Sequence, residues 1–122
     1  MKLADRCNSI EESYEFMLAY AAQGVAYGVE IREYLAKAAQ ALKGISAAAR
    51  DELDSSFLTV LDRDAADSLA AIELVLAQPA ISSQLVDNLN ASIHLRALLT
   101  DLFLIDEVLK AQQNTEVRFS AG

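Results

Sequence analysis

Apolar and small residues recur at intervals of three or four positions through the first third of the chain. The intervals average about 3.5 residues, which is typical of a long helix packed lengthwise against partners. The series predicts a helix over residues 9–43, with Ser9 and Glu12 matching a capping box and Gly44 ending the helix. Its members are Ile10, Tyr14, Met17, Ala21, Gly24, Gly28, Ile31, Leu35, Ala38 and Leu42.

Two glycines lie in the middle of this series. Glycine inside a helix costs about 1 kcal/mol relative to alanine. We favour one continuous helix in which Gly24 and Gly28 allow a partner backbone to approach closely. The alternative is a break at Gly24 that produces two shorter helices.

Helical spacing continues through the rest of the chain, with no convincing alternation. Ser46 is a candidate N-cap, and the proline of Gln78-Pro79 disfavours helix at the residue before it. We expect one all-α domain over residues 1–122. Because short connections make helices antiparallel neighbours, the predicted fold is an antiparallel bundle of three long helices, about 9–43, 46–77 and 80–113, or four if the first breaks. Residues 1–8 and 114–122 are expected to be flexible ends.

The third predicted helix carries an unusually wide apolar stripe. From residue 98 to residue 105 only Thr100 and Asp101 are polar. A helix covered on one side needs a narrower stripe. This helix is therefore either central to the protomer or an interface with another chain, and Leu102 and Phe103 are candidate interface residues.

Aromatic side chains form a second seam on the first predicted helix. Tyr20, Tyr27 and Tyr34 follow one another at intervals of seven residues, with Phe16 one turn before the first. Tyrosine combines a large apolar ring with a hydroxyl that needs a partner, which suits interfaces and ligand grooves. The alternative is that the rings line the edge of the bundle with their hydroxyls in water.

Charge and cysteine content exclude several classes of partner and compartment. Ten basic and eighteen acidic residues give a net charge of −8, which disfavours binding to nucleic acids and to anionic membrane surfaces. No apolar run approaches the roughly 18 residues of a membrane span, and no secretory signal is visible. A single cysteine, Cys7, cannot form an internal disulfide. We therefore expect a cytoplasmic protein.

Catalytic and metal-binding patterns are weak. His94 is the only histidine, and Asp101 lies two turns away, about 10 Å along a helix, so no nucleophile–base pair follows. Glu-x-x-His pairs of the ferritin-like kind are missing, and we expect no metal or cofactor.

Asp64 interrupts the apolar pattern, and if buried it would need a cation or would titrate abnormally. The candidate cations are Arg32, Arg63 and Arg96.

Three functional hypotheses follow. The first is a non-enzymatic interaction protein, such as an adaptor, assembly factor or small regulator, that acts as a homodimer and can bind a protein partner. The second is a small-ligand- or metal-binding bundle, possibly enzymatic, with Gly24, Gly28, Glu30 and His94 around a cavity. The third is a histidine phosphotransfer module that uses His94, although Arg96 is one position early for the usual His-x-x-Lys-Gly setting and no glycine follows.

Overall fold

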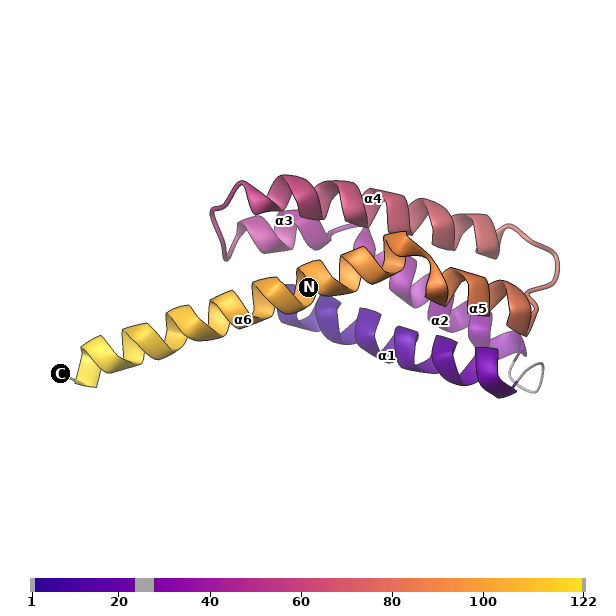
Figure 1. Cartoon of the computed structure of the whole chain (residues 1–122), viewed down its shortest axis with the longest axis horizontal. Coiled ribbons are helices and arrows are strands. Elements are labelled where there is room, and N and C mark those ends of the chain that lie inside the picture. Colours follow the sequence, from indigo (N-terminus) through magenta and orange to yellow (C-terminus); the bar gives the residue numbers. More distant parts are fainter. Residues whose placement is uncertain (1, 24–27, 122) are drawn as a thin grey trace.

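A computed structural model describes the backbone of residues 2–23 and 28–121 and the side chains of residues 2–23 and 30–113. Every regular element in these residues is an α-helix, so the all-α prediction is confirmed. The six helices are α1 (Leu3–Gln23), α2 (Gly28–Leu42), α3 (Ile45–Arg50), α4 (Phe57–Leu76), α5 (Ser83–Ala91) and α6 (Ile93–Ala121). Figure 1 shows five of them gathered in a bundle, with the second half of α6 projecting beyond it.

The continuous helix predicted over residues 9–43 is wrong. α1 ends at Gln23, and α2 begins at Gly28 and lies beside α1 as a hairpin (Figure 1). Gly24 and Tyr27 lie outside the described residues. The two glycines weaken helical continuity, and the reversal allows the two halves of the apolar seam to face each other.

The other two predicted long helices are also divided. Residues 51–56 separate α3 from α4, and Ser92 separates α5 from α6. Residues 51–56 are rich in Asp and Ser, whose side chains compete for backbone hydrogen bonds. Ser92 has extended dihedral angles, φ −63° and ψ 142°. Its Oγ accepts a hydrogen bond from the N–H of Leu95 at 3.4 Å, so the break also begins the next helix.

Several predicted helix ends are confirmed. α2 ends two residues before Gly44, and α4 ends three residues before Pro79. The N-cap predicted at Ser46 is wrong, because α3 begins at Ile45 and Gly44 is its N-cap. The N-cap that the sequence analysis did not name is Ser82 of α5, whose Oγ accepts a hydrogen bond from the N–H of Leu85 at 3.1 Å.

The predicted capping box at Ser9 is wrong, because α1 already begins at Leu3. Ser9 lies inside the helix, where its carbonyl accepts a hydrogen bond from the Ser13 hydroxyl at 2.7 Å. Leu3 is buried, and this burial favours the added turns. The helix therefore includes most of residues 1–8, which the sequence analysis assigned to a flexible end, and α6 likewise runs past residue 113.

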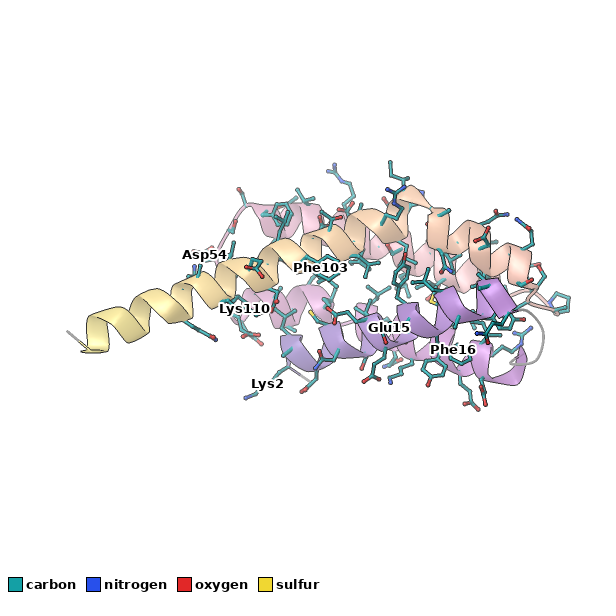
Figure 2. The ribbon with its side chains drawn as sticks, turned by 60° about the horizontal axis from the view of Figure 1, so that its bottom comes forward. Lys2, Glu15, Phe16, Asp54, Phe103 and Lys110 are labelled. Atoms are coloured by element: carbon teal, nitrogen blue, oxygen red, sulfur yellow. The ribbon has the colours of Figure 1, made fainter. Side chains whose placement is uncertain are left out.

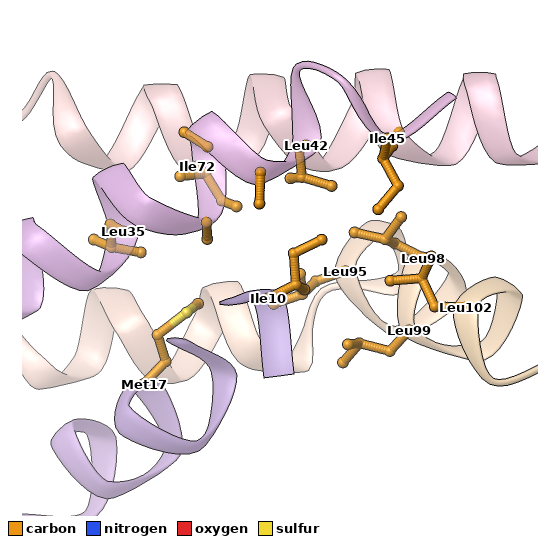
Figure 3. Packing of buried hydrophobic residues seen from close by; sticks show 14 of the residues in the cluster. Ile10, Met17, Leu35, Leu42, Ile45, Ile72, Leu95, Leu98, Leu99 and Leu102 are labelled. Carbon is orange, nitrogen blue, oxygen red and sulfur yellow. The ribbon is translucent and has the colours of Figure 1, made fainter. Parts of the chain in front are cut away.

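The core is built from every helix. α1 packs most extensively on α2 and α5, and α6 packs most extensively on α4. Figure 3 shows buried side chains converging from α1, α2, α3, α4 and α6: Ile10, Met17, Leu35, Leu42, Ile45, Ile72, Leu95, Leu98, Leu99 and Leu102. Burial of these side chains is the main favourable contribution to folding.

Two arginines close helix C-termini. Arg32 of α2 donates hydrogen bonds to the carbonyls of Leu76 (3.1 Å) and Gln78 (2.6 Å) at the end of α4. Arg6 of α1 donates to the carbonyl of Ala41 at 3.0 Å, at the end of α2. A cation at a helix C-terminus satisfies unpaired carbonyls and opposes the negative end of the helix dipole.

Gly44 is explained by this second arginine. A Cβ atom at residue 44 would lie 2.4 Å from the Arg6 Nη2 atom. The backbone of Gly44 has φ −121° and ψ 9°, so it does not have the left-handed conformation that favours glycine at helix ends. A side chain at residue 44 would therefore displace the guanidinium group of Arg6 from its present position.

Two polar side chains join α1 to the α5 region. The buried Tyr20 hydroxyl donates a hydrogen bond to the Ile81 carbonyl at 2.5 Å, and Asn90 Nδ2 donates to the Met17 carbonyl at 3.0 Å. Both bonds link segments that are far apart in the sequence. They fix the position of α5 on the hairpin.

We expect Tyr20→Phe to lower the free energy of unfolding by roughly 1–3 kcal/mol, because the Ile81 carbonyl would lose its buried partner. Urea denaturation monitored by circular dichroism measures this change. Tyr14→Phe is the control, since Tyr14 is only half-buried, and it should change stability by less than about 0.5 kcal/mol. Equal effects of the two substitutions would contradict the assigned role of the Tyr20 hydroxyl.

Candidate functional site

The aromatic seam is not one surface among the described residues. Tyr20 is buried in the core, whereas Tyr34 is half-buried and its ring stacks on Phe16 with centroids 4.2 Å apart. Lys37 Nζ lies 5.8 Å from the Tyr34 ring centroid, within the range of a cation–π contact. Tyr27 lies outside the described residues. The two described tyrosines therefore have different environments, and only Tyr34 is at the surface.

The predicted ligand residues are also separated. Gly24 is outside the described residues, Gly28 is the first residue of α2, and Glu30 is exposed on the same helix. His94 is exposed at the start of α6, where its Nδ1 atom lies 3.9 Å from Asp67 Oδ2. No hydrogen bond or ion pair between described side chains joins Glu30 to His94. Neither Glu30 nor His94 lines either of the two grooves described below.

The wide stripe of α6 is divided between the core and the surface. Leu102 is 2% exposed and belongs to the core, whereas Phe103 is 55% exposed. Figure 2 shows Phe103 and, further along α6, Lys110. Leu104 is 51% exposed and Val108 is 44% exposed. Of the two candidate interface residues, Phe103 is thus at the protomer surface and Leu102 is not.

An apolar groove lies between α6 and the start of α4. Its volume is ≈ 240 Å³. We call it the α4–α6 groove. It is lined by Leu53, Ser55, Phe57, Leu104, Ile105 and Val108. Five of these six residues are apolar, and Leu104 and Val108 also line it as exposed side chains.

A pair of carboxyl groups lies further along the same helix–helix contact. Asp101 of α6 is only 5% exposed, and its Oδ2 atom has no hydrogen-bond partner. Burial, hydrogen bonding to the Asp64 carboxyl and the negative charge of Asp64 raise the pKa of Asp101 to about 7. We call Asp64 and Asp101 the carboxyl pair. At mildly acidic pH, Asp101 therefore keeps its proton.

The sequence analysis identified Asp64 but not its partner. Arg32 instead binds the C-terminus of α4, and neither Arg63 nor Arg96 forms an ion pair with another described residue. Asp101 was considered only with His94. Its position within the wide apolar stripe was the signal that it would be buried.

A second groove, of ≈ 420 Å³, lies between the start of α1 and α6. It is lined by Leu3, Cys7, Glu11, Glu52, Leu102, Asp106, Leu109 and Lys110, among others. Burial and the nearby charges of Glu11, Asp106 and Glu52 raise the pKa of the Cys7 thiol to about 11. The thiol is therefore protonated at neutral pH and is a poor nucleophile.

Comparisons with known proteins give no functional assignment: no family model matches the chain, no curated protein matches its sequence, and no solved structure matches it. In the described part of the chain, no helix is long and apolar enough to cross a membrane. The same residues contain no group of three or more His, Cys, Asp or Glu side chains that could hold a metal ion.

We expect Asp101→Asn to remove a pH dependence of stability. The folded-state pKa of about 7 lies above the ordinary aspartate pKa of 3.8. The stability associated with the bound proton is thus fully present below pH about 4 and is lost as the pH rises through about 7. At about 1.4 kcal/mol per pKa unit, the free energy of unfolding falls by an amount on the order of a few kcal/mol. The variant should therefore gain stability over the wild type between pH 5 and pH 8.

Urea denaturation of both proteins at the two pH values measures this difference. Asp87→Asn, at an exposed position of α5, is the control and should follow the wild type. A difference between the Asp101 variant and the wild type that stays constant from pH 5 to pH 8 would contradict the raised pKa.

Proposed function

We propose that this chain is a non-enzymatic interaction protein that works through α6 and self-associates as a homodimer. One observation supports the proposal. Four of the seven exposed large apolar side chains among the described residues lie on α6: Ile93, Phe103, Leu104 and Val108. Exposed apolar residues that gather on one element are typical of an interaction site, whereas single scattered ones are ordinary.

Phe103 is the best candidate for the centre of the self-interface. Aromatic side chains are enriched among the residues that dominate binding energy, because they bury a large area at a low entropic cost. Phe103 lies near the middle of α6, and its exposed neighbours one turn before and after it, Thr100 and Asp106, are polar. Other positions on the exposed side, such as Arg96 and Glu107, are charged, and they would form a polar rim.

The charge of the protein opposes this association. Each protomer has a net charge of −8, so two protomers repel each other at low ionic strength. Added salt weakens this repulsion, because exposed charges further apart than the Debye length, about 10 Å at 0.1 M, are largely screened. Self-association should therefore strengthen as salt is added.

We expect the wild type to be dimeric at low micromolar concentration and Phe103→Glu to be monomeric, because the variant would bury a charge in an apolar interface. Light scattering after size exclusion measures the molar mass, and circular dichroism verifies equal helix content. Leu74→Glu is the matched control: Leu74 is 67% exposed but lies on α4, and the variant should remain dimeric. A monomeric wild type, or a dimeric Phe103→Glu protein, would refute the proposed self-interface.

A small-ligand site in the groove between α1 and α6 is the second candidate. The groove volume of ≈ 420 Å³ lies in the usual range of small-molecule sites, and its leucines lie beside carboxylates of both helices. Such a lining suits an organic cation with an apolar body. Native mass spectrometry of the purified protein would support this candidate if it detected a retained small molecule, and an empty protein would weaken it.

A further inference from the structure

The α4–α6 groove and the carboxyl pair lie along the same contact between α4 and α6. Ser68 donates a hydrogen bond to the His94 carbonyl at 2.9 Å, while Phe57, earlier in α4, shares the groove with Val108, later in α6. The two helices are therefore antiparallel. Asp101 is one turn from Leu104 and Ile105, so it lies on the same flank of α6 as the groove. An apolar depression and a carboxyl pair thus follow each other along one helix–helix contact.

The rim of this groove is acidic and is not neutralised within the described part of the protein. Asp54 lies in the connection between α3 and α4, beside the part of α6 between Phe103 and Lys110 (Figure 2). Asp54 follows Leu53 and Glu107 precedes Val108 in the sequence, and both carboxylates are exposed and form no ion pair with another described residue.

The nearby cations already have partners. Arg50 Nη2 lies 2.6 Å from Asp62 Oδ2, and Lys110 Nζ lies 2.9 Å from Asp106 Oδ2. A ligand that brought positive charge to the rim would therefore meet carboxylates that no cation among the described side chains neutralises. Such a ligand would gain from electrostatic attraction during approach as well as in the complex.

We propose that the α4–α6 groove binds a basic amphipathic helix of a partner protein. The partner's leucine-type side chains would occupy the apolar depression between Phe57, Leu104 and Val108. Its lysines or arginines would lie over Asp54 and Glu107. This inference rests on the proposed role of α6 in interactions. The basic character of the partner helix is inferred from charge complementarity with the acidic rim.

A second copy of the chain does not fit this groove. The acidic protomer offers no long helix with an excess of basic residues: α1, α2, α4 and α6 each have at least as many acidic as basic residues in their sequence, and α5 has none that is basic. The six-residue α3 has one basic residue, Arg50, and is too short to serve as such a helix. The groove and Phe103 are also on different flanks of α6, since Phe103 does not line the groove. The two interactions are therefore separable by substitution.

A designed peptide tests the proposal on the full chain. The probe is a fluorescent helix of about 18 residues, long enough for several helical turns, with leucines at i, i+4, i+7 and i+11 and lysines beside them. A second peptide carries glutamates in place of the lysines. We expect saturable binding of the lysine peptide in fluorescence anisotropy, no binding of the glutamate peptide, and weaker binding as salt is added.

Surface variants locate the binding site. Leu104→Ser combined with Val108→Ser should raise the dissociation constant about tenfold or more, as expected for central interface residues. Asp54→Lys changes only an exposed connection and should raise it several-fold. Leu74→Ser, at an exposed apolar position of α4, should leave it unchanged. Circular dichroism verifies that the variants keep their helix content.

Three outcomes would overturn the proposal: no saturable binding at low salt, equal binding of the glutamate peptide, or an equal effect of Leu74→Ser. Phe103→Glu separates this proposal from self-association, since it should abolish the dimer and still bind the lysine peptide. The two interactions also respond to salt in opposite directions.

Discussion

The hairpin of α1 and α2 is the contact on which the rest of the protein depends. Met17 and Tyr20 of α1 and Ile31 and Leu35 of α2 are all buried, and this paired seam forms the platform for the other helices. α5 packs on α1, α4 packs on α2, and α6 is held mainly by α4. Loss of the hairpin would therefore remove the support of every later element.

Polar contacts then fix how the helices meet. Arg32 of α2 binds the end of α4, Arg6 of α1 binds the end of α2, and Tyr20 of α1 binds the segment before α5. In each case a side chain of one helix satisfies a carbonyl at the end of a neighbouring element. Because a buried carbonyl without a partner is costly, the end of one helix also sets the position of the next.

Local chemistry in the sequence predicts the helical class and several helix ends. The stops before Gly44 and Pro79 needed only neighbouring residues. The breaks after Gln23 and at Ser92 depend on which surfaces become buried, so periodicity alone did not predict them. Ser9 shows the same limit: its capping pattern is valid locally, but burial of Leu3 extends the helix past it.

The candidate site was predicted in part, for a related reason. Tyr20 and Tyr34 occupy equivalent positions in the sequence pattern, but they lie on different arms of the hairpin, so one is buried and the other is at the edge. The width of the α6 stripe correctly suggested two apolar sides. The pattern did not show which residues of the stripe would be buried and which exposed, because Leu102 and Phe103 are adjacent in sequence but lie in different environments. Asp101 was missed as the partner of Asp64, since their contact joins two separate helices.

The acidity of the protein would make its apolar α6 surface favour basic partners over acidic ones. An exposed apolar helix face would associate with many partners if it were neutral, whereas uncompensated carboxylates repel acidic partners and attract basic ones. The carboxyl pair adds a further constraint, because Asp64 and Asp101 lie in the contact through which α4 holds α6. A cation brought by a partner and a proton taken from solution would both reduce the repulsion within this pair. The proposed binding at the groove and the protonation of Asp101 would therefore act on the same helix–helix contact.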